Sequence, residues 1–398
     1  MTRIFPKGLF PLWIAGFIST AGDSMHQVAL MWLVYELTGS ATVTGLVGMA
    51  QYLPSVFFGI FAGAAVDKLN RKRVMIFADA ARVLLVVLIP ILYVGGYMTG
   101  MLLGLIAFMI AIFTTLFMPA RDSIIPQLVD STDLIKAGSY MQAAGGFAYF
   151  AGPVLAAAIL PVAKLTGLFY ADAATYAVSL LFLLCLRPRP LVRKTPSSPA
   201  WTMVKQGLGY ARRSSLIRGL LLITAIDNLF IMGPALVGTP LYVRLHLGLG
   251  AGAYAAVQGS FAAGMIVGSF LVPFISKRMK RGRILLWAII FDGFTFVPFL
   301  WADSLLAAML LWFVHSIGVP FILVPRTTII QTCISEDYQG RIFSMVNLTV
   351  VGLSAISCGL TGMAAEVMPV NWLFALIGVL AGLVGLSGWM FKALRETA

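Results

Sequence analysis

Charged residues are scarce in this chain. Asp, Glu, Lys and Arg make up 11% of the 398 residues and hydrophobic residues make up 60%, whereas globular proteins carry about a quarter charged residues. This composition excludes a water-soluble domain and predicts an all-α polytopic membrane protein. Residues 37–66 contain none of the four charged types, and this run is longer than the ~20 residues that a helix needs to cross a bilayer.

Enzyme signatures are also missing from the sequence. It has no phosphate-cradling loop with Lys and Ser/Thr, no His/Glu metal spacing, and no soluble stretch long enough for an ATPase. We therefore expect neither an enzyme nor a cofactor or metal, and energy must come from an ion gradient or from the substrate. Cys185, Cys333 and Cys358 are odd in number and share no ligand spacing, so we interpret them as buried apolar residues.

The net charge of +13 would suggest nucleic-acid binding in a soluble protein. Here the positions of the cations favour membrane topology over nucleic-acid binding as the reason for this charge. Apart from Lys164 and Arg244, the Lys and Arg residues fall in loops or at helix ends on one side of the predicted spans. Short loops rich in Lys and Arg stay in the cytoplasm, so both termini are expected there and nucleic acid is not expected as a partner.

Twelve apolar segments follow one another along the chain. They cover residues 9–36, 42–66, 74–94, 101–122, 136–160, 165–186, 215–238, 252–276, 284–301, 304–325, 340–363 and 371–392. Residues 187–214 interrupt this pattern with a basic, Pro-rich stretch typical of a solvated linker. We therefore predict a six-helix bundle over 1–186, a cytoplasmic linker over 187–214 and a second six-helix bundle over 215–398.

The two halves repeat each other. The motif that begins at Gly59 recurs at Gly264, and the motif at Arg121 recurs at Arg326, while Asp23 recurs one residue out of step as Asp227. Matches at nearly one offset, on either side of a central linker, favour duplication. Two bundles of like topology are the geometry of transporters that rock around an interfacial site. The small residues in Gly59-x-x-x-Gly63 and its repeat predict close helix packing.

Over essentially its whole length the sequence resembles the major facilitator superfamily. The stretches that carry the resemblance are the loop from Gly63 through Asp67 to Arg73, Gly152-Pro153 in the fifth span, residues 21–40, and residues 119–129. Asn70 stands where the family commonly has Gly, and Ala156-Ala157 replace the Gly-Gly of the exporter motif. The last two stretches look like the branch of macrolide and siderophore exporters. The resemblance implies proton-driven efflux of small molecules from the bacterial cytoplasmic membrane, with substrate, protons and lipid as partners and a monomeric state.

A cytoplasmic latch is the first candidate site. Asp67 ends the second span within a cationic loop that includes Arg71. If the halves pack as in this family, the N-terminus of the eleventh span arrives there, and its partial positive charge and Arg341 would hold Asp67. Asp79 and Arg82 are one helical turn apart, so we expect them to pair and, close to the cytoplasmic end, to join this cluster as a salt-bridge network. Arg121 and Asp122 at the end of the fourth span are expected to do the same. The alternative is that these charges are solvated topology signals.

Ionisable residues near mid-membrane are the second candidate site. Asp23 and His26 share one face of the first helix, about 14 residues after it begins. Removing water favours the neutral form of each group, so Asp23 is a candidate proton carrier with His26, and Asp227 is its counterpart. The alternative is that Asp23 bonds a neighbouring helix and never titrates. Asp172 and Asp292 are each alone in the sequence, and either could bond backbone or belong to the proton path, while His315 is interpreted as a satisfied buried histidine.

Cargo contacts are expected from side chains facing the interface of the bundles. Aromatic, Met and amide groups make an adaptable, mainly apolar surface. The candidates are Met25, Trp32, Gln51, Phe113, Phe117, Met118, Gln142, Asn228, Phe230, Met232, Gln258, Phe261, Trp312 and Asn347. Their character favours an amphipathic cargo. Two other functions stay open: a lipid or lysolipid translocator, and a transport-inactive receptor or scaffold.

Replacing Asp67 tests the latch. Asp67→Asn removes the charge that the latch needs, so we expect the resting population to move toward the inward-open state and transport to be abolished. Flux into proteoliposomes measures this, and wild-type flux in the variant would exclude the latch.

Overall fold

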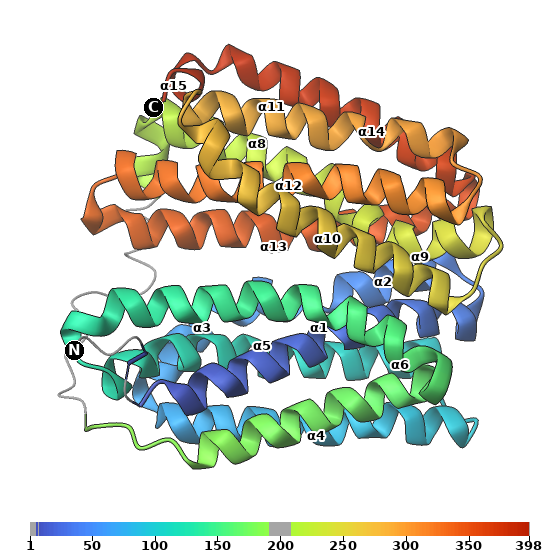
Figure 1. The fold of residues 1–398 in the computed structure, drawn as a ribbon, viewed down its shortest axis with the longest axis horizontal. Helices are drawn as coiled ribbons and strands as arrows, with labels where there is room; N and C mark the ends of the chain where they lie inside the picture. Colours follow the sequence, from blue (N-terminus) through green and yellow to red (C-terminus); the bar gives the residue numbers. More distant parts are fainter. Residues whose placement is uncertain (1–4, 7, 191–207, 398) are drawn as a thin grey trace. The chain divides into compact units, whose positions relative to one another are not determined.

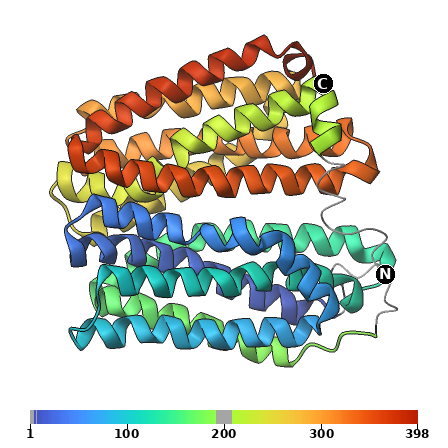
Figure 2. The ribbon, with the colours of Figure 1, turned by 180° about the vertical axis from the view of Figure 1, so that it is seen from behind.

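The computed structural model describes residues 5–6, 8–190 and 208–397 of the chain, without the side chains of residues 60, 64, 67, 336 and 337. Every regular element in these ranges is a helix. The helices form two compact units, Met1–Thr38 with Leu53–Pro196, and Gly39–Tyr52 with Ser197–Ala398. We call them the first and the second unit (Figures 1 and 2).

The first unit holds five long helices and one short turn. They are α1 (Phe10–Thr38), α3 (Leu53–Lys68), α4 (Arg71–Val94), α5 (Gly100–Leu128), a 3-10 turn (Ser131–Asp133) and α6 (Leu134–Leu184). Lys164 inside α6 has a φ of 58° and divides it into two helices. This left-handed conformation is rare for a residue with a Cβ, and Pro161 just before it weakens the helix further.

The second unit holds the remaining helices. They are α2 (Ala41–Ala50), α8 (Ser215–Gly233) with π-helical turns Pro234–Gly238 and Tyr242–His246 around α9 (Thr239–Leu241), α10 (Ala251–Ser276), α11 (Arg281–Phe294) with a 3-10 turn Val297–Trp301, α12 (Leu305–Cys333), α13 (Glu336–Val367), α14 (Val370–Ser387) with a 3-10 turn Gly388–Met390, and α15 (Lys392–Arg395).

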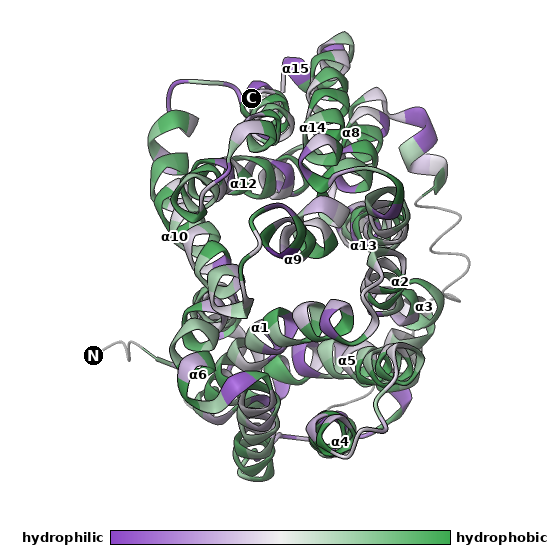
Figure 3. Cartoon of the chain, turned by 90° about the vertical axis from the view of Figure 1, so that its right-hand side faces the viewer, coloured by the Kyte–Doolittle hydropathy of each residue, from purple (hydrophilic) through white to green (hydrophobic). Residues whose placement is uncertain are grey.

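Ten helices in the described ranges are long and apolar enough to cross a membrane. One of the ten, over residues 131–184, contains the break at Lys164 and therefore holds two of the predicted spans. The first predicted span, α1, is 29 residues long but falls outside the ten, because Asp23, His26 and Gln27 lower its hydropathy. With α1 and both parts of α6, the helices account for the twelve segments expected from the sequence. Hydrophobic residues cover most of their length (Figure 3).

Short polar side chains start several of these helices. Ser40, Asn70 and Thr99 each accept a hydrogen bond from a backbone N–H three residues ahead, at the starts of α2, α4 and α5. Such caps satisfy donors that have no partner inside the helix. Each unit also packs its own apolar core, around Met75, Ile124 and Leu183 in the first and around Leu220, Leu286, Ile330 and Ile342 in the second.

Close packing at the repeated glycines differs between the two motifs. A Cβ at Gly264 or Gly268 would lie 2.1–2.3 Å from backbone oxygens of α12, so the second motif packs tightly as expected. A Cβ at Gly59 or Gly63 would meet no described atom within 4 Å, so the expectation is wrong for the first motif. The expectation of buried cysteines is likewise right for Cys358 and wrong for Cys185 and Cys333, which are exposed.

The second predicted span is divided between the units. Its first part, α2, packs against α13 of the second unit, while α3 belongs to the first unit. A Cβ at Gly45 would lie 2.8 Å from the Cα of Gly362, so glycine allows the two backbones to touch. At the start of α2, the Thr42 N–H donates to the Glu366 carboxylate at 2.9 Å. Nothing in the sequence distinguishes α2 from α3, because residues 37–66, which hold α2 and nearly all of α3, contain no charged residue.

A new cysteine tests the packing of α2 on α13. A Cβ at position 48 would lie 3.3 Å from the Cβ of Cys358, near the Cβ separation of a disulfide. In a Cys185→Ser/Cys333→Ser background, Gly48→Cys should form a disulfide with Cys358 under mild oxidant, as measured by peptide mass spectrometry.

Leu46→Cys is the matched control for this crosslink. Leu46 is two residues away on α2 and 44% exposed, so its thiol should stay free. Equal crosslinking of the two variants, or none in Gly48→Cys, would contradict the packing.

Candidate functional site

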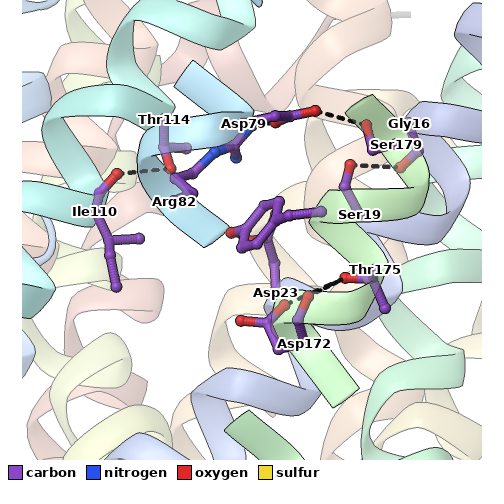
Figure 4. A network of polar contacts seen from close by, with 11 residues as sticks. Gly16, Ser19, Asp23, Asp79, Arg82, Ile110, Thr114, Asp172, Thr175 and Ser179 are labelled. Carbon is purple, nitrogen blue, oxygen red and sulfur yellow. Dashed lines mark hydrogen bonds and ion pairs between the residues drawn. The ribbon is translucent and has the colours of Figure 1, made fainter. Parts of the chain in front are cut away.

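Asp23 belongs to a buried polar cluster made by α1, α4 and α6 of the first unit. The Tyr176 hydroxyl on α6 donates a hydrogen bond to the Asp23 carboxylate, and Figure 4 shows Asp23 beside Asp172, below Asp79 and Arg82 in this view. The Arg82 guanidinium on α4 lies 4.4 Å from the ring centroids of Tyr176 and Phe117. Aromatic rings attract a cation at this distance. Tyr176 therefore contacts both Asp23 and Arg82.

Asp79 completes the pairing of Arg82. Its carboxylate accepts one hydrogen bond from Arg82 and another, at 2.7 Å, from the Ser179 hydroxyl on α6. Asp79 is 0% and Arg82 1% exposed. The sequence assigned both residues to the latch around Asp67. The structure instead places them beside Tyr176, in the cluster that contains Asp23.

A second pair, His26 and Asp172, adjoins this cluster. His26 Nδ1 on α1 lies 2.9 Å from Asp172 Oδ2 on α6, and the Thr175 hydroxyl donates to the Asp172 backbone carbonyl at 2.7 Å. The sequence left Asp172 without a partner, because helix periodicity identifies residues on one helix face but not the helix that this face meets. The i, i+3 spacing of Asp23 and His26 did indicate that these two residues lie on the same face of α1.

The two pairs do not balance in charge. Three carboxylates, Asp23, Asp79 and Asp172, share one permanent cation, Arg82, and one histidine, so negative charge remains even when His26 is protonated. A buried excess charge is costly, and binding a proton removes it. Asp79 and Asp172 are fully buried, whereas Asp23 keeps partial exposure. Asp23 is therefore the least buried of the three carboxylates.

The Gly152-Pro153 motif borders the same cluster. A Cβ at Gly152 on α6 would lie 2.4 Å from the Ser24 Cβ and 2.7 Å from the Met25 backbone nitrogen. The Ser24 hydroxyl also donates to the Tyr149 carbonyl at 2.8 Å. The motif thus brings the first part of α6 against α1 between Asp23 and His26.

Asp227 has different surroundings from Asp23, its counterpart in the repeat. It is 7% exposed on α8, and its Oδ1 atom has no hydrogen-bond partner among the described residues. The cation that acts on it is Arg326 of α12. The neighbouring Asn228 donates to the Thr224 carbonyl within its own helix. The repeat therefore predicted a buried carboxylate here but not its environment.

The predicted cargo residues differ widely in exposure. Met25, Trp32, Phe117, Asn228 and Trp312 are buried. Gln51, Phe113, Phe230, Met232, Gln258 and Phe261 are partly exposed, and Met118, Gln142 and Asn347 are exposed. Some have contacts inside their own unit: the Trp32 indole donates to Glu36, and Phe117 lies against Arg82. The cargo assignment stays a prediction.

The latch also stays a prediction, since the Asp67 side chain lies outside the described residues. Its expected partners have contacts of their own. Arg341 lies 4.9 Å from the ring centroid of Tyr338, and Arg121 pairs with the adjacent Asp122 at 2.8 Å. Arg71 begins α4 directly after the cap residue Asn70.

The family of the chain follows from comparison with known proteins. Residues 12–359 match the family model described as Major Facilitator Superfamily. The chain belongs to the major facilitator superfamily. It is therefore a multi-pass membrane transporter and not an enzyme.

Among curated superfamily proteins, the chain is similar to macrolide efflux protein A of Streptococcus pyogenes, with 24% identity over 97% of this chain and 96% of that protein. It is 24% identical to the multidrug efflux pump Tap of Mycobacterium tuberculosis, over 97% and 94% of the two chains. An uncharacterised transporter of this type from Bacillus subtilis, YfiS, is 26% identical over 98% and 94%.

Solved structures of superfamily transporters have the same fold. A variant of the nucleoside transporter NupG superposes with a TM-score of 0.82 at 12% identity, over 96% of this chain and 99% of that chain. A bacterial homologue of the human lysosomal transporter Spinster, inward-facing and occupied, gives 0.77 at 13% identity, over 96% of each chain.

Removing one member of the Asp79–Arg82 pair tests its energetic role. Arg82→Met leaves Asp79 ionised and buried without a cation, which should lower the free energy of unfolding by about 3–5 kcal/mol. Asp79→Leu/Arg82→Met removes both charges and should recover most of this loss. Thermal unfolding in detergent, followed by tryptophan fluorescence, measures both.

Arg121→Met is the control for that loss of stability. It breaks a pair whose aspartate is 63% exposed, and exposed pairs contribute about 0–1 kcal/mol. If Arg82→Met were no more damaging than Arg121→Met, the buried pair would not stabilise the first unit.

Proposed function

We propose that this transporter is a proton-coupled exporter of amphipathic or lipophilic small molecules in a bacterial cytoplasmic membrane, with both termini in the cytoplasm. The observation that carries the proposal is the charge imbalance around Asp23. Three carboxylates and one permanent cation form a cluster in which one carboxylate is less buried than the other two. Such a cluster can bind and release a proton without exposing its other charges.

Tyr176 gives the cluster a means of holding either state of Asp23. When Asp23 is ionised, the Tyr176 hydroxyl donates to it and the Arg82 guanidinium lies over the same ring. When Asp23 binds a proton, Arg82 keeps its bond to Asp79. Arg82 therefore never becomes an unpaired buried cation, and Asp23 is the group whose charge changes.

The position of the cluster supports coupling to movement. Asp23 and His26 lie on either side of the α1 segment that touches Gly152 at backbone distance. Beside Asp23, the backbones of α1 and α6 are in contact. A change of charge at Asp23 therefore cannot be accommodated by side-chain movement alone. We infer that proton binding changes the packing of α1 against α6, which is the step that links the proton to alternating access.

The direction of transport and the class of cargo are supported by two independent observations. The curated relatives that match almost the full length are named for macrolide and multidrug efflux. The candidate cargo residues are mainly aromatic, Met and amide side chains, which suit a lipophilic molecule with few polar groups.

Flux in proteoliposomes tests the proton-coupled function. With radiolabelled erythromycin as probe, an imposed pH gradient should drive uptake by the wild-type protein. In Asp23→Asn the rate of this gradient-driven uptake should fall by about tenfold or more. Erythromycin exchange across the membrane without a gradient should persist in Asp23→Asn, because the fold and the cargo residues are unchanged.

Asp122→Asn is the matched control, since Asp122 is an exposed carboxylate outside the cluster. It should keep wild-type flux. Gradient-driven flux that survives in Asp23→Asn would contradict proton coupling at this residue. Transport of a fluorescent lysophospholipid but not of erythromycin would support the lipid translocator, and absence of any flux would support the receptor.

A further inference from the structure

A second buried carboxylate–histidine pair lies in the second unit, away from the cluster around Asp23. Asp292 is in the last turn of α11 and His315 is on α12, and they are 2% and 1% exposed. His315 Nε2 lies 3.6 Å from Asp292 Oδ1. The proposed function does not use either residue.

The hydroxyl of Thr295 determines which nitrogen of His315 carries hydrogen. It lies 2.8 Å from the Asp292 backbone carbonyl and 2.8 Å from His315 Nδ1. A carbonyl can only accept, so the single hydroxyl hydrogen of Thr295 goes to Asp292. The Thr295 oxygen must then accept from His315, and Nδ1 therefore carries a hydrogen.

This assignment leaves Nε2 facing a carboxylate. In a neutral imidazole with hydrogen on Nδ1, Nε2 is an acceptor. Asp292 Oδ1, the atom that it faces, has no hydrogen-bond partner among the described residues. Two acceptors facing each other in a dry site repel, and each is left unsatisfied. A proton on Nε2 or on the Asp292 carboxyl resolves both problems at once.

The surroundings of the pair favour an added positive charge. Asp292 lies in the last turn of α11, and the C-terminus of a helix carries partial negative charge. The rings of Phe296 and Trp312 lie 4.8 and 5.1 Å from the His315 ring and cover it from water. The charged group that acts on Asp292 is another carboxylate, Asp227 of α8, with Arg326 beyond it. The neighbouring helices α10 and α14 contain no charged residue in their sequences.

We propose that Asp292 and His315 form a second proton-binding site, so that each unit of the transporter binds a proton of its own. The pair is not a copy of His26–Asp172, because its residues come from α11 and α12 and do not stand at the repeat offset. The proton is inferred from two contacts, that of Thr295 with His315 Nδ1 and the 3.6 Å approach of Nε2 to Asp292 Oδ1. Its release during transport rests on the proposed function.

Nitrogen NMR of ¹⁵N-histidine-labelled protein in nanodiscs tests the site directly. The chain has three histidines, so His315→Gln identifies the His315 signals by their loss. We expect Nδ1 to be protonated, together with either a protonated Nε2 or a protonated Asp292 carboxyl. The second case appears as an infrared carboxylic-acid band that is lost in Asp292→Asn.

Asp292→Asn is also the matched variant for the histidine signals. Its amide can donate to Nε2, so His315 should become neutral with hydrogen on Nδ1. A His315 that is neutral with hydrogen on Nε2, or neutral with hydrogen on Nδ1 and no Asp292 carboxylic-acid band, would overturn the proposal.

Proton counting in proteoliposomes tests whether the site takes part in transport. Asp292→Asn should lower the number of protons moved per erythromycin by about half, while Asp122→Asn should leave it unchanged. An unchanged ratio in Asp292→Asn would overturn the transport role. Failure of proton coupling at Asp23 is detected separately, by flux in Asp23→Asn, and leaves the histidine spectra to decide the pair.

Discussion

A charge buried in an apolar bundle needs a compensating partner, and this requirement organises the interior of the first unit. Arg82 is nearly inaccessible, so its contacts with Asp79, Phe117 and Tyr176 must all be in place at once. Those contacts join α4, α5 and α6. Because each partner comes from a different helix, one guanidinium holds three helices in a defined arrangement. Tyr176, which also bonds Asp23, is positioned by the same contacts.

The two units use the same chemistry with different helices. In the first, α1 and α6 supply His26 and Asp172; in the second, α11 and α12 supply Asp292 and His315. Asp23 and Asp227 stand at matching positions of the two halves of the sequence, but their neighbours differ. The carboxylate–histidine pairs likewise occupy different helices in the two units. A transporter built this way can give its halves unequal roles.

Features that depend on local composition could be predicted from the sequence, and contacts between distant helices could not. Uncharged runs predicted the helices, and the i, i+3 spacing of Asp79 and Arg82 predicted their pairing. The partner of Asp172 could not be predicted, since His26 is remote in sequence and helix periodicity does not identify the neighbouring helix. For the same reason the contacts of Arg82 with Phe117 and Tyr176 were not predicted. Gly59 and Gly63 show the converse, a packing motif for which the described residues supply no packed neighbour.

The assignment of α2 to the second unit has a topological consequence. The polypeptide passes between the units at residues 38–39, at 52–53 and again at 196–197. Residues 39–52 therefore belong to the second unit although the first unit flanks them in sequence, and a cut between residues 196 and 197 would leave the units joined through two covalent connections. Gly39, with a φ of 61°, is one of these connections. A branched side chain at residue 39 would disfavour this backbone conformation. Because the residue joins the two units, the strain would act on the chain segments of both.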